Sequence, residues 1–211
     1  MKQTLFISII ALSLAPIYGA TSQTFSISKN TNLVIEKGDI TKCPVESIVN
    51  AANEQLLGGA GVCGAIFNSA GWDKLQKACD KYTENNNVRC PVGKACITDS
   101  FNLKSLGIKH IIHAVGPDCR IIKDTKQQDF LLEQSYKNSL ILADKNNITS
   151  IAFPFISSAI YAFPKKRASN IALKTVVNYI KNNNTKINSV YFVLFSQEDF
   201  DLFCCESKNI I

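Results

Sequence analysis

Several signatures are scarce or missing in this 211-residue sequence, and each absence excludes a class of site. There are only two histidines, His110 and His113, and no two of the eight cysteines have the CxxC spacing that zinc sites use. No glycine-rich stretch is followed by Lys-Ser or Lys-Thr, as it would be in a P-loop. We therefore expect no bound metal ion and no cofactor.

Long apolar runs are also scarce, and the one that stands out lies at the N-terminus. Lys2 precedes apolar residues 5–15, and Pro16, Gly19 and Ala20 supply the breaker and small residues of a secretory signal. The run is shorter than the roughly 20 residues of a spanning helix, which disfavours an uncleaved membrane anchor. We expect a signal peptide at residues 1–20, one domain at residues 21–211, and a mature protein that is secreted or periplasmic and not membrane-bound.

Acidic residues are outnumbered, 17 against 23 lysines and arginines, which gives a formal net charge of +6. The basic residues are scattered, apart from Lys165, Lys166 and Arg167, and no stripe of basic and aromatic residues marks a nucleic-acid surface. We expect no nucleic-acid partner, although an anionic small molecule suits the charge. The 46% of hydrophobic residues suffices for one core, and we expect a monomer.

Short apolar runs typical of strands alternate with longer segments typical of helices. The expected strands are residues 25–28, 33–36, 47–50, 96–99, 110–115, 151–155 and 190–195. The expected helices are residues 62–82, 128–146 and 168–181, with polar turns at 85–87 and 182–184. This alternation predicts an α/β fold in which helices cover a largely parallel central sheet.

Three loops of unusual composition follow predicted strands. Gly38 and Asp39 follow the second strand, residues 50–61 the third, and residues 154–163 the sixth. Ligands of such sheets bind outside the carboxyl ends of the strands, so we expect the three loops to converge on one site. Small residues let the backbone approach a ligand, and the helix expected directly after residues 58–61 favours a diphosphate at its N-terminus.

Five motifs in these loops and strands occur in a recognisable order. They are GDIT (38–41), IVNAAN (48–53), LLGGAGVCGAI (56–66), IIHAVGP (111–117) and FPFISSAIYAFP (153–164). In this order and spacing the chain resembles the macrodomain family over roughly residues 33–203. The resemblance implies a three-layer α/β/α fold with a mixed, largely parallel central sheet that binds ADP-ribose.

The resemblance also implies roles for individual residues. Asp39, beside Ile40, would hydrogen-bond the adenine, Phe195 would stack on it, and Asn53 would contact the distal ribose. Asn50 belongs to the ligand site as well, with bonding to the backbone that shapes the loop as its favoured role. The two loops around the diphosphate would supply the remaining ligand contacts, from Gly58, Gly59, Ala60, Gly61, Val62, Cys63, Ser157, Ser158, Ala159, Ile160 and Tyr161.

Some positions depart from the family pattern. Hydrolytic MacroD-like members carry an aspartate after GGGGV and a histidine four residues later, where this sequence has Cys63 and Phe67. Ala159 and Ala162 stand where glycines are common in the family. Some viral macrodomains carry GVC where this sequence has Cys63, and they are still regarded as de-ADP-ribosylating enzymes. A thiol near a helix start is expected to have a lowered pKa. No motif pairs Cys63 with a histidine, so a packing role is favoured over a nucleophilic one.

Two functions are compatible with the resemblance. One is an ADP-ribosyl hydrolase that releases mono-ADP-ribose from acidic side chains of modified proteins or deacetylates O-acetyl-ADP-ribose, with Asn53 as its catalytic residue. The other is a non-catalytic reader that holds ADP-ribose. The retained Asn53 favours the hydrolase, whereas Cys63, Phe67 and Ala159 favour the reader. In both cases the partner would be ADP-ribose or an ADP-ribosylated protein.

Overall fold

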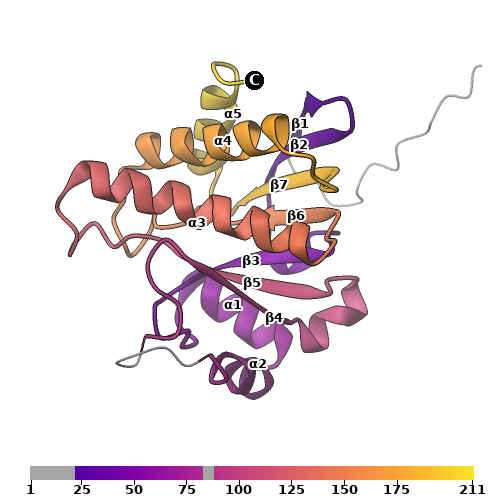
Figure 1. Ribbon diagram of the computed structural model, residues 1–211, viewed down its shortest axis with the longest axis vertical. Coiled ribbons are helices and arrows are strands. Elements are labelled where there is room, and N and C mark those ends of the chain that lie inside the picture. Colours follow the sequence, from indigo (N-terminus) through magenta and orange to yellow (C-terminus); the bar gives the residue numbers. More distant parts are fainter. Residues whose placement is uncertain (1–21, 83–87) are drawn as a thin grey trace, which may run out of the picture.

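The computed structural model describes residues 22–82 and 88–211. The expected signal peptide precedes this range and the turn expected at residues 85–87 falls in the gap, so both lie outside the described residues. Within these residues seven strands form one sheet in the order β1-β2-β7-β6-β3-β5-β4 (Figure 1). The strands are β1 Ser22–Ser28, β2 Thr31–Lys37, β3 Ser47–Ala52, β4 Ala95–Asp99, β5 His110–Val115, β6 Ser150–Phe153 and β7 Ser189–Leu194.

The centre of the sheet is parallel and its edges are antiparallel. Strands β2, β7, β6, β3 and β5 pair in parallel, whereas β1 pairs antiparallel with β2 and β4 antiparallel with β5. The prediction of a mixed, largely parallel sheet is therefore confirmed. Because parallel strands all end at the same edge, the loops that follow β2, β3, β5, β6 and β7 meet there.

Helices cover both faces of the sheet. Helices α1 (Gly61–Ala70) and α2 (Trp72–Cys79) pack on one face, and α3 (Thr125–Lys145), α4 (Lys165–Asn182) and α5 (Gln197–Ser207) on the other (Figure 1). Neighbouring strand residues face opposite layers: Ile48 is buried on the α1 side and Val49 on the α3 side. The central strands β3, β5, β6 and β7 are mostly apolar because both of their faces are buried, whereas the edge strand β1 is polar and largely exposed.

The helix predicted for residues 62–82 is in fact two helices. Gly71 separates α1 from α2 and has a φ of +92°, a conformation that side chains other than hydrogen rarely allow. The apolar periodicity continues across this break because both helices turn an apolar side to the same layer, with Ile66 and Leu75 both fully buried there. A glycine within an apolar pattern was the available signal for a helix end.

Three helical segments of the described residues were not predicted, and one of them is the short 3₁₀ helix η1 (Ile40–Lys42). Helix α5 begins after Ser196, whose hydroxyl accepts from the Asp199 N–H at 3.1 Å and donates to the Asp199 carboxylate at 2.8 Å. This S-x-x-D pattern is a helix-start signal that can be read from sequence. The 3₁₀ helix η3 (Phe101–Leu106) is short and carries no comparable signal in its sequence.

The end of the sheet opposite the loop cluster is held by Glu46. Its carboxylate accepts from Lys109 Nζ at 2.6 Å, Thr149 N at 2.7 Å and Thr149 Oγ1 at 2.9 Å, so it joins the starts of β3, β5 and β6. These hydrogen bonds, the one from Lys109 first, lower the pKa of Glu46 to about 2. This part of the stability is present above the ordinary glutamate pKa and is lost as the pH falls toward 2.

Within the described residues, no helix combines the length and the apolar character that crossing a membrane would require.

Candidate functional site

Two of the three loops predicted to converge, residues 50–61 and 154–163, meet at a cleft at the carboxyl ends of β3, β5 and β6, whereas Gly38 and Asp39 do not line it. Its volume is about 250 Å³. The lining residues are Ala51, Ala52, Asn53, Gly59, Ala60, Gly61, Val62, Cys63, Gly116, Phe155, Ile156, Ser157, Ala159, Ile160 and Tyr161. A larger hollow of about 410 Å³ lies between α3 and α4, but it contains none of the predicted site residues.

Most predicted contact residues line this cleft. The ones that do not are Asp39, Ile40, Asn50, Gly58, Ser158 and Phe195. Five lining residues were not predicted individually: Ala51, Ala52, Gly116, Phe155 and Ile156. All five lie inside the motifs at 48–53, 111–117 and 153–164, and their place in these motifs was the signal available for them.

The first wall of the cleft is the turn from β3 into α1. The cap residue Ala60 offers no side-chain acceptor to the first turn of α1, so the N–H groups there remain available to an anion. A Cβ on Gly64 would lie 2.5 Å from Gly59 O, so only glycine lets the loop pack this closely on the helix. Gly59, Gly61 and Gly64 have the G-x-G-x-x-G spacing of phosphate-binding turns.

The second wall is the loop that follows β6. Ser157 and Ala162 have φ values of +64° and +52°, a left-handed region that costs a side-chain-bearing residue roughly 1–2 kcal/mol. Ser157 Oγ is buried against Gly116 and has no hydrogen-bond partner in the described chain. The Ser158 hydroxyl instead donates to Phe155 O at 2.9 Å, within the loop. Ser157 is thus the hydroxyl of this loop whose hydrogen-bonding capacity is unused within the described chain.

Asp39 and Phe195 lie side by side beyond the lined cleft. They follow the parallel neighbours β2 and β7, and Gly38 N donates to Leu194 O at 2.9 Å. The Phe195 ring is 88% exposed, whereas Ile40 is buried. Asp39 Oδ1 accepts from Thr41 N at 3.0 Å and Thr41 Oγ1 at 2.8 Å, and Asp39 Oδ2 lies 3.7 Å from Lys42 Nζ. The exposed ring and carboxylate form an extension of the site toward β2 and β7.

Comparison with known proteins agrees with this geometry. The family model described as Macro domain matches residues 49–172. A macro domain-containing protein of Listeria monocytogenes is 45% identical over 173 residues, which cover 81% of this chain and 94% of that protein. The chain belongs to the macrodomain family.

Other relatives of this macrodomain carry functional names. The O-acetyl-ADP-ribose deacetylase of Escherichia coli is 41% identical and is covered over 93% of its length by 82% of this chain. An ADP-ribose glycohydrolase of Xenopus laevis is 42% identical over 79% of this chain and 38% of that protein. The Oceanobacillus iheyensis macrodomain with ADP superposes with a TM-score of 0.82 at 36% identity, covering 91% of this chain and 97% of that one. The predicted family and the predicted three-layer fold are confirmed.

Asn50 does not shape the loop through backbone bonds, as the sequence had suggested. Its Nδ2 donates to His113 Nδ1 at 3.1 Å and to Cys63 Sγ at 3.6 Å. The amide that does bond to the loop backbone is Asn53, which donates to Leu57 O at 2.9 Å and accepts from Leu57 N at 3.0 Å. The loop-shaping role therefore belongs to Asn53, three residues further along the chain.

The prediction of a lowered thiol pKa at the start of α1 was wrong. Burial raises the pKa of Cys63, and the opposing hydrogen bonds from Asn50 and the Gly59 backbone are smaller effects. At neutral pH Cys63 is therefore a protonated thiol, and it does not supply the nucleophile that a thiolate would. This supports the packing role over the nucleophilic one.

Phe67, which replaces the histidine of hydrolytic relatives, does not face the cleft. It is fully buried and packs against Trp72, with ring centroids 5.2 Å apart, and near His113 at 6.4 Å. A histidine placed there would lie in the same apolar layer. Within residues 22–82 and 88–211, no group of three His, Cys, Asp or Glu side chains could hold a metal ion.

His113 is a buried neutral side chain in the middle of β5. It accepts from Asn50 at Nδ1, so Nε2 carries the proton and donates to Thr98 Oγ1 at 3.0 Å. Desolvation lowers the pKa of His113 from 6.5 to about 4. The unfolded chain therefore binds a proton between these two pH values that the folded chain excludes.

We predict that the free energy of unfolding decreases by about 2 kcal/mol between pH 7.5 and pH 5 because His113 is protonated only in the unfolded chain. Urea unfolding at the two pH values measures this loss. The variant His113→Gln is expected to be less stable at pH 7.5 but to have little dependence on pH in this range. Glu46 does not interfere, since its window lies below pH 4.5. Equal pH slopes for the two proteins would contradict the assignment.

Proposed function

We propose that this macrodomain binds ADP-ribose and hydrolyses the bond between its distal ribose and an acidic side chain of a modified protein, or the acetyl ester of O-acetyl-ADP-ribose. The carrying observation is the cleft in which the Asn53 loop, the first turn of α1 and the loop after β6 face one another. The names of its deacetylase and glycohydrolase relatives support the same chemistry.

The ligand-facing groups suit a diphosphate flanked by two different ends. The open N–H groups of the first turn of α1 and the unpartnered Ser157 hydroxyl are donors for phosphate oxygens. The exposed Phe195 ring and the Asp39 carboxylate suit the adenine, as a stacking face and as an acceptor for its amino group. Asn53 and Tyr161 then flank the remaining part of the cleft, where the distal ribose would lie.

Deacetylation requires a water molecule that attacks the ester carbonyl, whereas release from an acidic side chain requires one that attacks the anomeric carbon of the distal ribose. The new bond joins the water oxygen to this carbon, the bond from the carbon to the ester oxygen breaks, and the leaving group departs as a carboxylate. The water proton passes to the substrate phosphate and then to solvent. Asn53 fixes the ribose, and the surrounding backbone exposes one face of it to water.

The second candidate function is a reader that binds ADP-ribose without turnover. Cys63 is a protonated thiol where hydrolytic relatives carry an aspartate, and Phe67 is buried in the core. In the described residues no ionisable carboxylate or imidazole lines the cleft. This arrangement binds a dianionic diphosphate without like-charge repulsion, and it leaves proton transfer to water and the substrate.

We predict that Gly59→Ala raises the dissociation constant for ADP-ribose about tenfold, equivalent to about 1.4 kcal/mol, because the methyl group occupies ligand space. A Cβ on Gly59 would meet no protein atom within 4 Å, so the fold itself does not require glycine there. Calorimetric titration measures the effect, and thermal unfolding is expected to show an unchanged or slightly raised Tm. Wild-type affinity in this variant would place the diphosphate elsewhere.

We predict that Asn53→Ala lowers the rate of ADP-ribose release from a glutamate-modified protein by about a hundredfold and changes the affinity for ADP-ribose far less, because the amide acts on the ribose during bond cleavage. Single-turnover release is measured beside calorimetric titration. Wild-type protein that binds ADP-ribose but releases none is the reader. Wild-type protein that fails to bind sinks both functions.

We also propose that residues 1–20 are an export signal, that the mature chain is a secreted or periplasmic monomer, and that its partner is an ADP-ribosylated protein. The support is the short apolar run after Lys2 and the small residues that follow it. Fractionation of the producing cells is expected to recover a chain that begins at Ala20 or Thr21. A cytoplasmic protein that retains Met1 would contradict export.

A further inference from the structure

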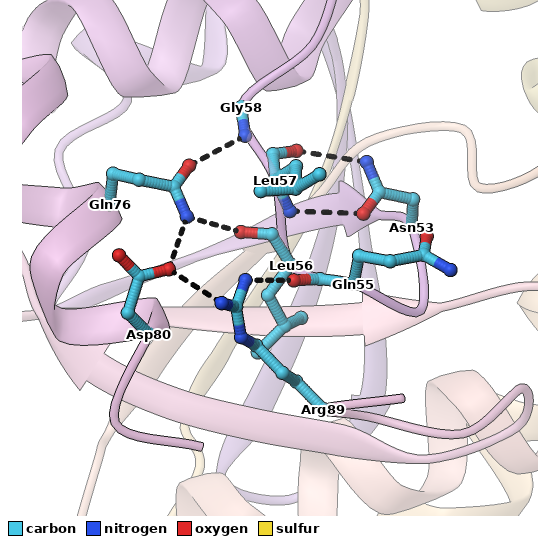
Figure 2. A network of polar contacts seen from close by, with 8 residues as sticks. All are labelled: Asn53, Gln55, Leu56, Leu57, Gly58, Gln76, Asp80 and Arg89. Atoms are coloured by element: carbon cyan, nitrogen blue, oxygen red, sulfur yellow. Dashed lines mark hydrogen bonds and ion pairs between the residues drawn. The ribbon is translucent and has the colours of Figure 1, made fainter. Parts of the chain in front are cut away.

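The loop between Asn53 and Gly58 has no regular structure, yet its backbone is densely hydrogen-bonded (Figure 2). Leu56 N donates to Asn53 O at 3.0 Å, and the Asn53 side chain closes a pair of bonds with Leu57. Leu56 is buried with a φ of +52°, an unfavourable conformation that persists only where neighbours enforce it. The loop that carries Asn53 is thus held in one conformation against its local preference.

Gln76 of α2 supplies one of these enforcing contacts. Its Oε1 accepts from Gly58 N at 3.0 Å, and its Nε2 donates to Leu56 O at 3.3 Å (Figure 2). The two bonds lie on either side of Leu57, whose N–H and C=O are the groups that the Asn53 amide bonds. Gln76 therefore fixes the peptide groups that in turn fix the direction of the Asn53 side chain.

The orientation of the Gln76 amide is itself determined by its surroundings. Gln76 Nε2 also donates to Asp80 Oδ1 at 2.9 Å, so its nitrogen faces two acceptors and its oxygen faces one donor. A flipped amide would turn its oxygen toward a carbonyl and a carboxylate. Arg89 holds Asp80 in place at 3.0 Å and donates to Gln55 O at 2.7 Å, so it grips the same loop (Figure 2).

Packing prevents the loop from compensating for a lost hydrogen bond. A Cβ on Gly58 would lie 2.5 Å from the Trp72 ring and 2.8 Å from Phe67, so the chain already touches α1 and α2 there. Without Gln76 the buried side of the loop would keep its position, but the Leu56 carbonyl and Gly58 N–H would lose their partner. The peptide groups on either side of Leu57 would then keep their bonds to the Asn53 amide but lose the contacts that fix their direction from the α2 side.

We propose that Gln76 is a positioning residue of this macrodomain, which directs the Asn53 amide at the distal ribose, and that Asp80 and Arg89 set the orientation of Gln76. This proposal rests on the proposed hydrolysis. None of the three side chains lines the cleft, so each acts only through the loop. Binding of ADP-ribose depends on many contacts outside this loop, whereas bond cleavage depends on the Asn53 geometry.

The test compares Gln76→Ala and Gln76→Glu with Lys77→Ala, an exposed neighbour on the same helix. We expect both Gln76 variants to lower kcat for ADP-ribose release at least about tenfold, with a change in the dissociation constant below threefold, and Lys77→Ala to match wild type. Adding Asp80→Asn to Gln76→Glu returns an amide donor opposite the carboxylate and is expected to recover part of the lost kcat.

A second readout tests positioning without turnover. The side-chain NH₂ resonances of Asn53, assigned by comparison with Asn53→Ala, are expected to shift in Gln76→Ala and to stay unchanged in Lys77→Ala. Wild-type kcat in the Gln76 variants overturns the proposal. If the wild-type protein binds ADP-ribose but does not hydrolyse it, the hydrolase function fails, and unshifted Asn53 resonances would overturn the positioning role as well.

Discussion

The parallel pairing of β2, β7, β6, β3 and β5 is the constraint on which the rest of this structure depends. Parallel strands require crossovers, and the crossover helices bury both faces of the sheet. The same pairing brings all five strand ends to one edge. Asp39, Asn53, Gly116, Phe155 and Phe195 come from distant parts of the chain and meet there because each directly follows a parallel strand or lies close behind it.

Where the chain leaves the sheet, its backbone N–H and C=O groups need new hydrogen-bond partners. In this respect the two sides of the site differ. On the protein side the loop after β3 is saturated, with carbonyl oxygens of Glu54, Gln55, Leu56 and Leu57 all accepting hydrogen bonds. On the cleft side the first turn of α1 has no side-chain cap, and the buried Ser157 hydroxyl has no hydrogen-bond partner in the described chain. Hydrogen-bond donors without a protein partner are therefore concentrated where an anionic ligand would lie.

The cleft is electrically neutral along its described lining. Burial keeps Cys63 protonated and His113 uncharged, and Phe67 turns into the core. Backbone dipoles, rather than side-chain charges, are then left to compensate a diphosphate. The rate of the proposed hydrolysis then depends on how accurately Asn53 positions the ribose. It therefore also depends on the contacts that hold Asn53.

The sequence by itself determined the family, the order of the seven strands along the chain and most of the residues that line the cleft, because motif order and apolar periodicity are local properties. Tertiary structure alone decided that burial outweighs the helix start at Cys63, and that Asn50 bonds to His113 while Asn53 shapes the loop. The partnership of Gln76 with Gly58, 18 residues away, was equally invisible. Hydrogen-bond partners and desolvation depend on which distant atoms arrive beside a group, and no local pattern records that.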